Sequence, residues 1–211
     1  MRIDKKLNLV IPILNDDGTA VVNYVHAVPL GADIIDRHFM VLGQTFSQIF
    51  TQGLGAASGP GMAMRLLRKT AEVTGVWDGP EGVAETVVAE IRRTAMVMTR
   101  DPASGWQAVP LQVAAERKMI SEDDRQEVEA AIVFFIVVSA TLARAQRKQM
   151  LEVAADLWGA QLSVLSSTEY MSSLRTSTAT VNSGANGSAA VPVTPVPANA
   201  TSDGKPLSVP H

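Results

Sequence analysis

The chain has 211 residues, of which 46% are hydrophobic and 18% charged, a composition typical of a globular protein that buries one core. Its net charge of −3 provides no basic field for nucleic acid or anionic lipid, so direct nucleic-acid binding is not expected. The sequence contains no cysteine, which excludes disulfides, thiolate catalysis and cysteine-ligated zinc.

The first predicted element is a β-hairpin within residues 1–30, packed on the rest of the chain. Residues 6–14 alternate, with Leu7, Leu9, Ile11 and Ile13 on one side, as in a half-buried strand. The turn signal Asn-Asp-Asp-Gly follows at 15–18, and residues 19–28 are again rich in β-branched side chains. Pro12 has no N–H to donate, so the first strand is expected at the edge of its sheet.

Three helices are predicted next. The first runs from Asp33 to about Phe50, because apolar residues recur there at spacings of three and four: Ile35, Phe39, Leu42, Phe46, Ile49 and Phe50. The glycine-rich stretch at 53–61 is interpreted as a hinge. The second helix extends from about Pro60 toward Val73, and the third covers about 83–98.

The next part of the chain is also predicted to be mainly helical. Residues 101–109 are expected to form a loop, and Pro110 suits the first turn of a short helix. Ser121 followed by three acids predicts a capped helix that could extend from 122 to about 164, with a break near Gly159. The sequence Ser-Ser-Thr-Glu at 166–169 is a capping-box pattern for a last short helical turn.

One apolar run, Ala130–Ala143, raises the question of a membrane span. It has 14 residues, includes Ser139 and Thr141, and is flanked by charged side chains. Because a span needs about 20 apolar residues, a buried central helix or an oligomer interface is the preferred interpretation. No membrane association is predicted.

The composition changes at Thr176. Residues 176–211 contain five prolines, no aromatic residue and two charged side chains, Asp203 and Lys205. Such a segment buries too little apolar area to offset its ordering entropy, so a disordered tail is predicted. The predicted fold class is therefore mainly α: a helical bundle (31–175) with an N-terminal β-hairpin (1–30) and a disordered C-terminal tail (176–211).

No pattern in the sequence indicates catalysis. The glycines at 53–59 lack the preceding strand and the Lys-Ser/Thr pair of a phosphate loop. His26 and His38 could join an aspartate at a metal, but ordinary hydrogen bonding is the preferred interpretation for both. The acids at 122–129 lack calcium-loop spacing. We predict no enzyme activity, no catalytic residue, no cofactor and no metal.

Several segments, taken in order, carry a resemblance to a protein family. They are Lys5–Ile13, Val25–Phe50 with the run Phe39-Met40-Val41-Leu42-Gly43-Gln44-Thr45-Phe46, Glu90–Arg93, Ser121–Val138 with its Phe134-Phe135 pair, and Ser167–Thr178. Together, across about residues 3–180, they resemble the tail assembly chaperones of long-tailed (siphovirus-type) bacteriophages.

The resemblance implies a mainly helical, non-enzymatic protein that keeps the tape-measure protein soluble and helps to recruit tail tube subunits. Its implied partners are the tape-measure protein and the tail tube protein, with self-association. Its implied location is the host cell cytoplasm during phage assembly, with absence from the finished virion. Members of the family are often made in a short form and a longer frameshifted form.

Candidate partner-binding residues are apolar side chains on the predicted helices: Phe39, Phe46, Phe50, Phe134, Phe135, Met96 and Met98. Methionines adapt to varied partners, although in this aromatic-poor chain they could equally fill the core. The alternative function is a structural subunit retained in the virion, a minor tail or connector protein, with hairpin and tail as arms. A regulatory enzyme subunit is a weaker alternative.

Overall fold

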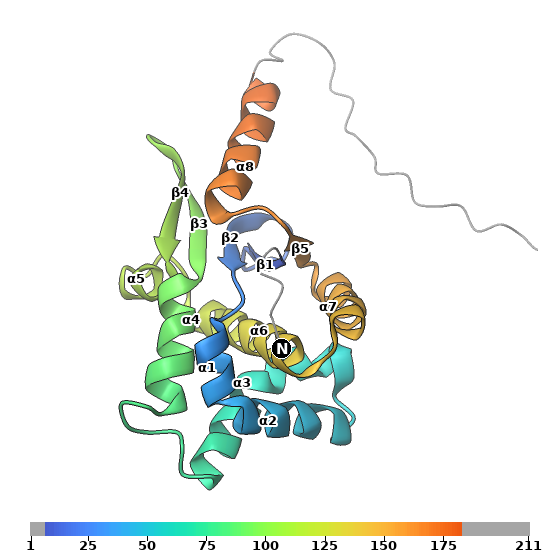
Figure 1. The fold of residues 1–211 in the computed structure, drawn as a ribbon. Helices are drawn as coiled ribbons and strands as arrows, with labels where there is room; N and C mark the ends of the chain where they lie inside the picture. The colour runs from blue at the N-terminus through green and yellow to red at the C-terminus, as the bar shows by residue number, and fades with distance from the viewer. Residues whose placement is uncertain (1–6, 183–211) are drawn as a thin grey trace, which may run out of the picture.

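A computed structural model describes residues 7–182, with side chains described to residue 174 (Figure 1). The described chain contains one antiparallel five-stranded sheet, with strand order β4-β3-β2-β1-β5. The strands are β1 (Asn8–Leu14), β2 (Val21–Ala27), β3 (Met96–Asp101), β4 (Gly105–Pro110) and β5 (Gln161–Ser163).

The β1–β2 pair forms the predicted hairpin. Asn15 closes its turn, because the Asn15 side-chain oxygen accepts hydrogen bonds from the backbone N–H groups of Thr19 and Ala20 at 2.9 and 3.0 Å. Gly18 has φ +67°, a conformation that suits glycine. The predicted alternation also holds: Leu9, Ile11 and Ile13 pack in the main core, whereas Val10 packs on the other face of the sheet.

The prediction that β1 is an edge strand is wrong. β1 lies between β2 and the short strand β5. The β5 pairing covers only Asn8 to Val10, so Pro12 lies beyond its end and needs no N–H partner on that side. Pro12 pairs with Tyr24 of β2 and lies in the part of β1 that the β5 pairing does not reach.

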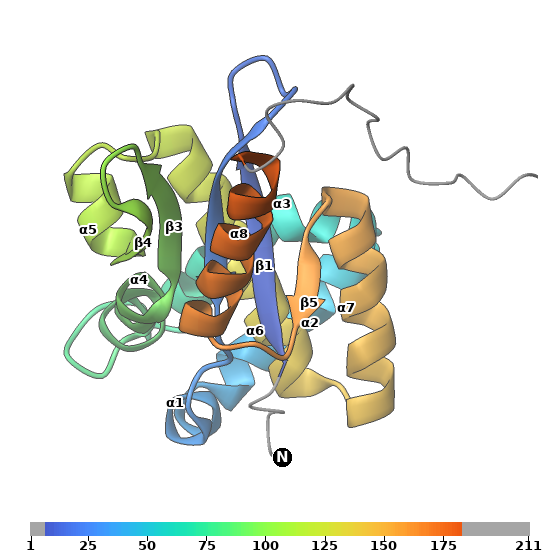
Figure 2. The ribbon, with the colours of Figure 1, turned by 90° about the horizontal axis from the view of Figure 1, so that it is seen from above.

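Helices cover both faces of the sheet (Figures 1 and 2). α8 lies across one face, and the other helices gather mainly on the opposite side, where α6 packs against α2, α3 and α7. The helical elements are α1 (Ala32–Arg37), α2 (Phe39–Thr51), α3 (Gly55–Val73), the π-helical η1 (Ala84–Val88), α4 (Ala89–Thr94), α5 (Leu111–Glu116), α6 (Glu122–Thr141), α7 (Arg144–Trp158) and α8 (Ser167–Asn182).

α6 is the central helix of the core. A capping box starts it, in which the Ser121 hydroxyl accepts from the Asp124 backbone N–H and the Asp124 carboxylate accepts from the Ser121 backbone N–H. Every residue from Val128 to Ala140 is buried, as expected of a helix that is apolar on all sides. No helix within residues 7–182 combines the length and apolarity needed to cross a bilayer.

The predicted fold class, a mainly α helical bundle, is wrong. The structure is 59% helix and 17% strand, an α/β mixture built on the five-stranded sheet. The predicted helix at 83–98 ends at Thr94, and the chain continues as β3. The predicted loop at 101–109 contains most of β4, and the predicted helix at 122–164 is divided into α6 and α7 at Leu142.

The predicted hinge and tail also differ from the structure. α3 begins at Gly55 and contains Pro60, so most of the glycine-rich stretch is helical. At Gly59 a Cβ atom would lie 2.7 Å from Ile49 Cγ2 and 2.9 Å from Phe134 Cε2, so glycine permits close packing of three helices. α8 continues to Asn182, past the predicted start of the tail. The rest of the predicted disordered tail, 183–211, lies outside the described residues.

Candidate functional site

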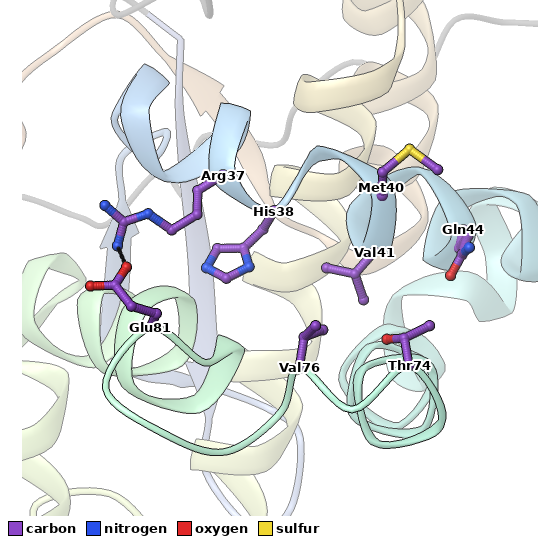
Figure 3. Close-up of a pocket in the computed structure, with 8 residues that line it drawn as sticks. All are labelled: Arg37, His38, Met40, Val41, Gln44, Thr74, Val76 and Glu81. Carbon is purple, nitrogen blue, oxygen red and sulfur yellow. Dashed lines mark hydrogen bonds and ion pairs between the residues drawn. The ribbon is translucent and has the colours of Figure 1, made fainter.

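A groove opens where the α1–α2 junction meets the end of α3 and the loop after it (Figure 3). Its volume is about 330 Å³. It is lined by Arg37, His38, Met40, Val41, Gln44, Thr74, Val76 and Glu81. We call this surface the α2–α3 groove.

The end of α3 determines where Val76 lies in the groove. Gly75 has φ +71°, and its backbone N–H donates to the Glu72 carbonyl at 3.1 Å. The Val76 N–H donates to the Ala71 carbonyl at 2.9 Å, which completes a Schellman motif. These bonds satisfy the last carbonyls of α3 and direct the chain across the groove.

His38 divides α1 from α2 and forms the polar end of the groove. The Thr86 hydroxyl donates to the Gly82 carbonyl at 2.6 Å, so the 2.6 Å contact between Thr86 and His38 requires a proton on His38 Nε2. Burial lowers the pKa of His38, and the neighbouring Arg37 lowers it further, against a smaller opposing effect of Glu81. The lowered pKa favours the neutral imidazole, which is hydrogen-bonded to the Thr86 hydroxyl.

The remaining groups of the groove provide mainly apolar contact. Arg37 and Glu81 pair with each other across one end. Met40 is 71% exposed and Val76 40% exposed, and both line the groove together with the buried Val41. Large apolar side chains that are exposed around a groove are a feature of protein-interaction surfaces.

Exposed apolar side chains continue beyond the groove. Val73, in the last turn of α3, is 80% exposed, and Phe39, in the first turn of α2, is 49% exposed. The first half of α2 and the end of α3 meet at the groove, which is lined by Met40 and Gln44 from α2 and by Thr74 at the end of α3. The apolar surface thus extends over two adjoining helix ends.

The structure does not bring the seven predicted partner-binding residues together. Phe39 lies on the surface beside Met40. The rings of Phe46 and Phe50 contact each other in a tilted arrangement, 4.5 Å between centroids, and pack half-buried against the core. Met96 is half-buried on β3. Phe134, Phe135 and Met98 are at most 1% exposed, so they build the core and offer a partner no surface in this conformation.

Sequence reasoning missed Met40, Val73 and Val76. The predicted helix was continuous from Asp33, which placed Phe39 on the buried stripe. The break at His38 rotates this stripe, so that the buried residues of α2 are Val41, Leu42, Thr45 and Ile49. Local periodicity alone does not show such a break.

The two histidines considered for a metal site have separate partners. His26, on β2, is 1% exposed, and its Nε2 lies 2.9 Å from the Leu165 carbonyl. Burial lowers the pKa of His26 more than this hydrogen bond raises it. No group of three His, Asp or Glu side chains within the described residues is arranged to hold a metal ion.

No protein-family model, curated protein or solved structure matches this chain. The functional interpretation therefore depends on the α2–α3 groove and on the segment resemblance described above.

Proposed function

We propose that the protein is a non-enzymatic tail assembly chaperone that keeps a tape-measure protein soluble and helps to recruit tail tube subunits. The observation that carries the proposal is the exposed apolar surface at the α2–α3 groove, which is lined by the exposed Met40 and Val76 and by the buried Val41. This surface includes part of the segment resemblance, because Phe39 and Met40 begin the run at 39–46.

The proposed interaction is a helix-in-groove contact. An amphipathic helix of the tape-measure protein would place apolar side chains against Met40, Val73 and Val76. Methionine has three rotatable side-chain bonds and tolerates varied partner shapes, which suits a protein that must bind many similar helical segments. Each contact would be modest, and several chaperone copies along one long partner would add avidity.

Recruitment of the tail tube protein and self-association belong to the same proposal. The proposal also includes that the protein acts in the host cell cytoplasm and is absent from the finished virion. Analysis of purified particles by mass spectrometry tests the last point, because a retained subunit would be found there in stoichiometric amount. Its detection would favour the virion-subunit alternative.

Co-expression with the tape-measure protein tests the chaperone function. The wild-type chain should increase the soluble fraction of the partner and co-purify with it. The double variant Met40→Glu/Val76→Glu should lose both effects, because charges would occupy the apolar groove. Salt should affect the interaction weakly compared with a nucleic-acid complex.

The matched control is Val153→Glu/Leu157→Glu on α7. These side chains are 48% and 58% exposed, so this variant adds the same charges to a different exposed apolar surface. Both double variants should keep the wild-type circular dichroism spectrum. Equal loss of binding in both would contradict a specific role of the groove. Failure of the folded wild type to solubilise the partner would contradict the chaperone function.

A further inference from the structure

A second cavity lies at the N-terminus of α7. Its volume is about 550 Å³, and it is lined by Leu7, Arg144, Ala145, Arg147, Lys148 and Val164. It shares no lining residue with the α2–α3 groove. Three of its six lining residues are cationic.

The charged side chains at the N-terminus of α7 are positive, whereas a helix N-terminus favours negative charges. The first turn contains no acidic residue, and the N-cap residue Ala143 makes no side-chain capping bond. Free backbone N–H groups and the helix dipole give this end a partial positive charge. Arg147 and Lys148 add positive charge, and Lys148 also lies 3.6 Å from the Glu152 carboxylate.

The burial of Arg147 is a second, independent indication of an anion site. It is 3% exposed, and its Nε and Nη1 atoms are buried without a hydrogen-bond partner. A guanidinium remains protonated in proteins, so this group keeps its charge after desolvation. Burial of an unpaired charge is strongly unfavourable unless an anion accompanies it.

Two hydrogen bonds hold the segment that contributes Val164 to the cavity. The Leu165 carbonyl accepts from Asn8 Nδ2 at 2.7 Å and from His26 Nε2 at 2.9 Å. The preceding residue, Val164, is 70% exposed and lines the cavity. The cavity is therefore lined both by cations of α7 and by an apolar segment that has a fixed position.

We propose that this cavity binds an oxoanion, a phosphate or a carboxylate, through the Arg147 guanidinium. The planar fork of Arg147 donates to two oxygens, N–H groups in the first turn of α7 add donors, and Lys148 supplies positive potential. Leu7 and Val164 accommodate the apolar part of an organic anion. This inference goes beyond the proposed chaperone function and does not depend on it.

Thermal denaturation and titration calorimetry of the full chain, with inorganic phosphate, acetate and chloride at matched ionic strength and pH 7.5, test the site. Phosphate or acetate should produce a saturable rise in Tm that chloride does not. The stronger of the two responses identifies the anion class. Arg147→Met should reduce the affinity roughly tenfold or more, because charge-assisted hydrogen bonds are lost.

Two further variants keep the test decisive. Arg147→Lys retains the charge but loses the planar fork, so it should bind more weakly than wild type even if Arg147→Met does not fold. Arg117→Met, at an exposed arginine elsewhere, should bind like wild type. An equal Tm response in wild type and both Arg147 variants would overturn the proposal, as would no response to either oxoanion.

The chain's own Asp4, three residues before Leu7, is a competing source of carboxylate. If Asp4→Asn gains anion binding that the wild type lacks, the natural occupant is this side chain and the proposal of an external ligand is overturned. If Asp4→Asn and wild type bind phosphate or acetate alike, the external site is supported.

Discussion

Arg92 on α4 donates two hydrogen bonds to the carboxylate of Glu129 on α6, from Nε at 2.8 Å and from Nη2 at 3.2 Å. Glu129 is 3% exposed and also accepts from Arg125 Nη1 at 2.6 Å. One buried carboxylate thus binds two guanidinium groups and joins α4 to the central helix. A charge in this position is compatible with burial only while both partners remain.

The substitution Glu129→Gln should therefore lower the free energy of unfolding by about 3 kcal/mol, the lower end of the range for broken buried pairs, since Arg92 is partly solvated. The urea midpoint measures this change. The matched control is Glu122→Gln, which removes a carboxylate that also pairs with Arg125 but is 61% exposed. Its effect on the urea midpoint should be small. Equal shifts in the two variants would contradict the expectation that the buried Glu129 contributes more to stability than the exposed Glu122.

The close approach of α3 to α2 and α6 at Gly59 predicts that alanine substitutions at Gly59 and Gly61 have opposite effects on stability. Gly59→Ala would force Ile49 or Phe134 to move, and such overpacking costs about 1–3 kcal/mol. The gain in helix propensity of about 1 kcal/mol offsets part of this cost. Gly61→Ala, two residues on in the same helix, meets no atom within 4 Å and should gain stability.

The predicted order of Tm is Gly61→Ala above wild type above Gly59→Ala. The difference between the two variants isolates the packing cost, because both make the same change within one helix. A Gly59→Ala variant as stable as Gly61→Ala would show that the three helices separate without penalty at this point.

The buried histidines predict a decrease in stability on mild acidification. Burial lowers the pKa of His26 and His38 below the unfolded value of about 6.5. As the pH falls through about 6.5, the unfolded chain binds protons before the folded chain does, so the free energy of unfolding decreases. The decrease stops once the pH is below the folded pKa values.

Urea denaturation between pH 8 and pH 5 measures this effect. The double variant His26→Gln/His38→Gln should show a flatter profile over this range, since the titrating rings are gone. Exposed carboxylates such as Glu122, with a pKa lowered to about 2, contribute in a separate and more acidic range. An unchanged slope in the double variant would contradict the assignment to histidine.

Sequence patterns predicted the elements that depend on local signals. The hairpin was indicated by alternation and by the Asn15–Gly18 turn, and the start of α6 by the Ser121 cap. The burial of the run at 130–140 followed from its length and its flanking charges. Each of these features depends on residues within a few positions of one another.

Elements that depend on distant contacts were not predicted. Val97 and Met98 on β3 are both buried, one on each face of the sheet, so the strand shows no alternation. β5 has three residues and exists through its pairing with β1. Likewise, the sequence shows cations at 144, 147 and 148 but does not show that Arg147 is buried with its Nε and Nη1 atoms lacking a hydrogen-bond partner.

α8 is held on the sheet by a small aromatic cluster, and this predicts local opening. Tyr170 is buried with Val10 and Met98, and its ring lies 5.9 Å from that of Tyr24 in an edge-on arrangement. The Tyr170 hydroxyl also accepts a hydrogen bond from Gln161 Nε2 at 2.6 Å. Tyr170 is the buried residue that α8 contributes to this cluster, with Met171 and Leu174 packed beside it, so removal of the ring takes away the largest described apolar contact of α8.

Tyr170→Ala should therefore release α8 from the sheet while the main core stays folded. Hydrogen exchange measured by mass spectrometry should show faster exchange in peptides from α8 and β4, and unchanged protection in α6. Tyr170→Phe keeps the ring and loses only the hydroxyl bond, a loss of about 1 kcal/mol, so its α8 should remain largely protected. If Tyr170→Ala instead accelerates exchange equally in α6, the two sides of the sheet unfold as one unit and α8 is part of the global core.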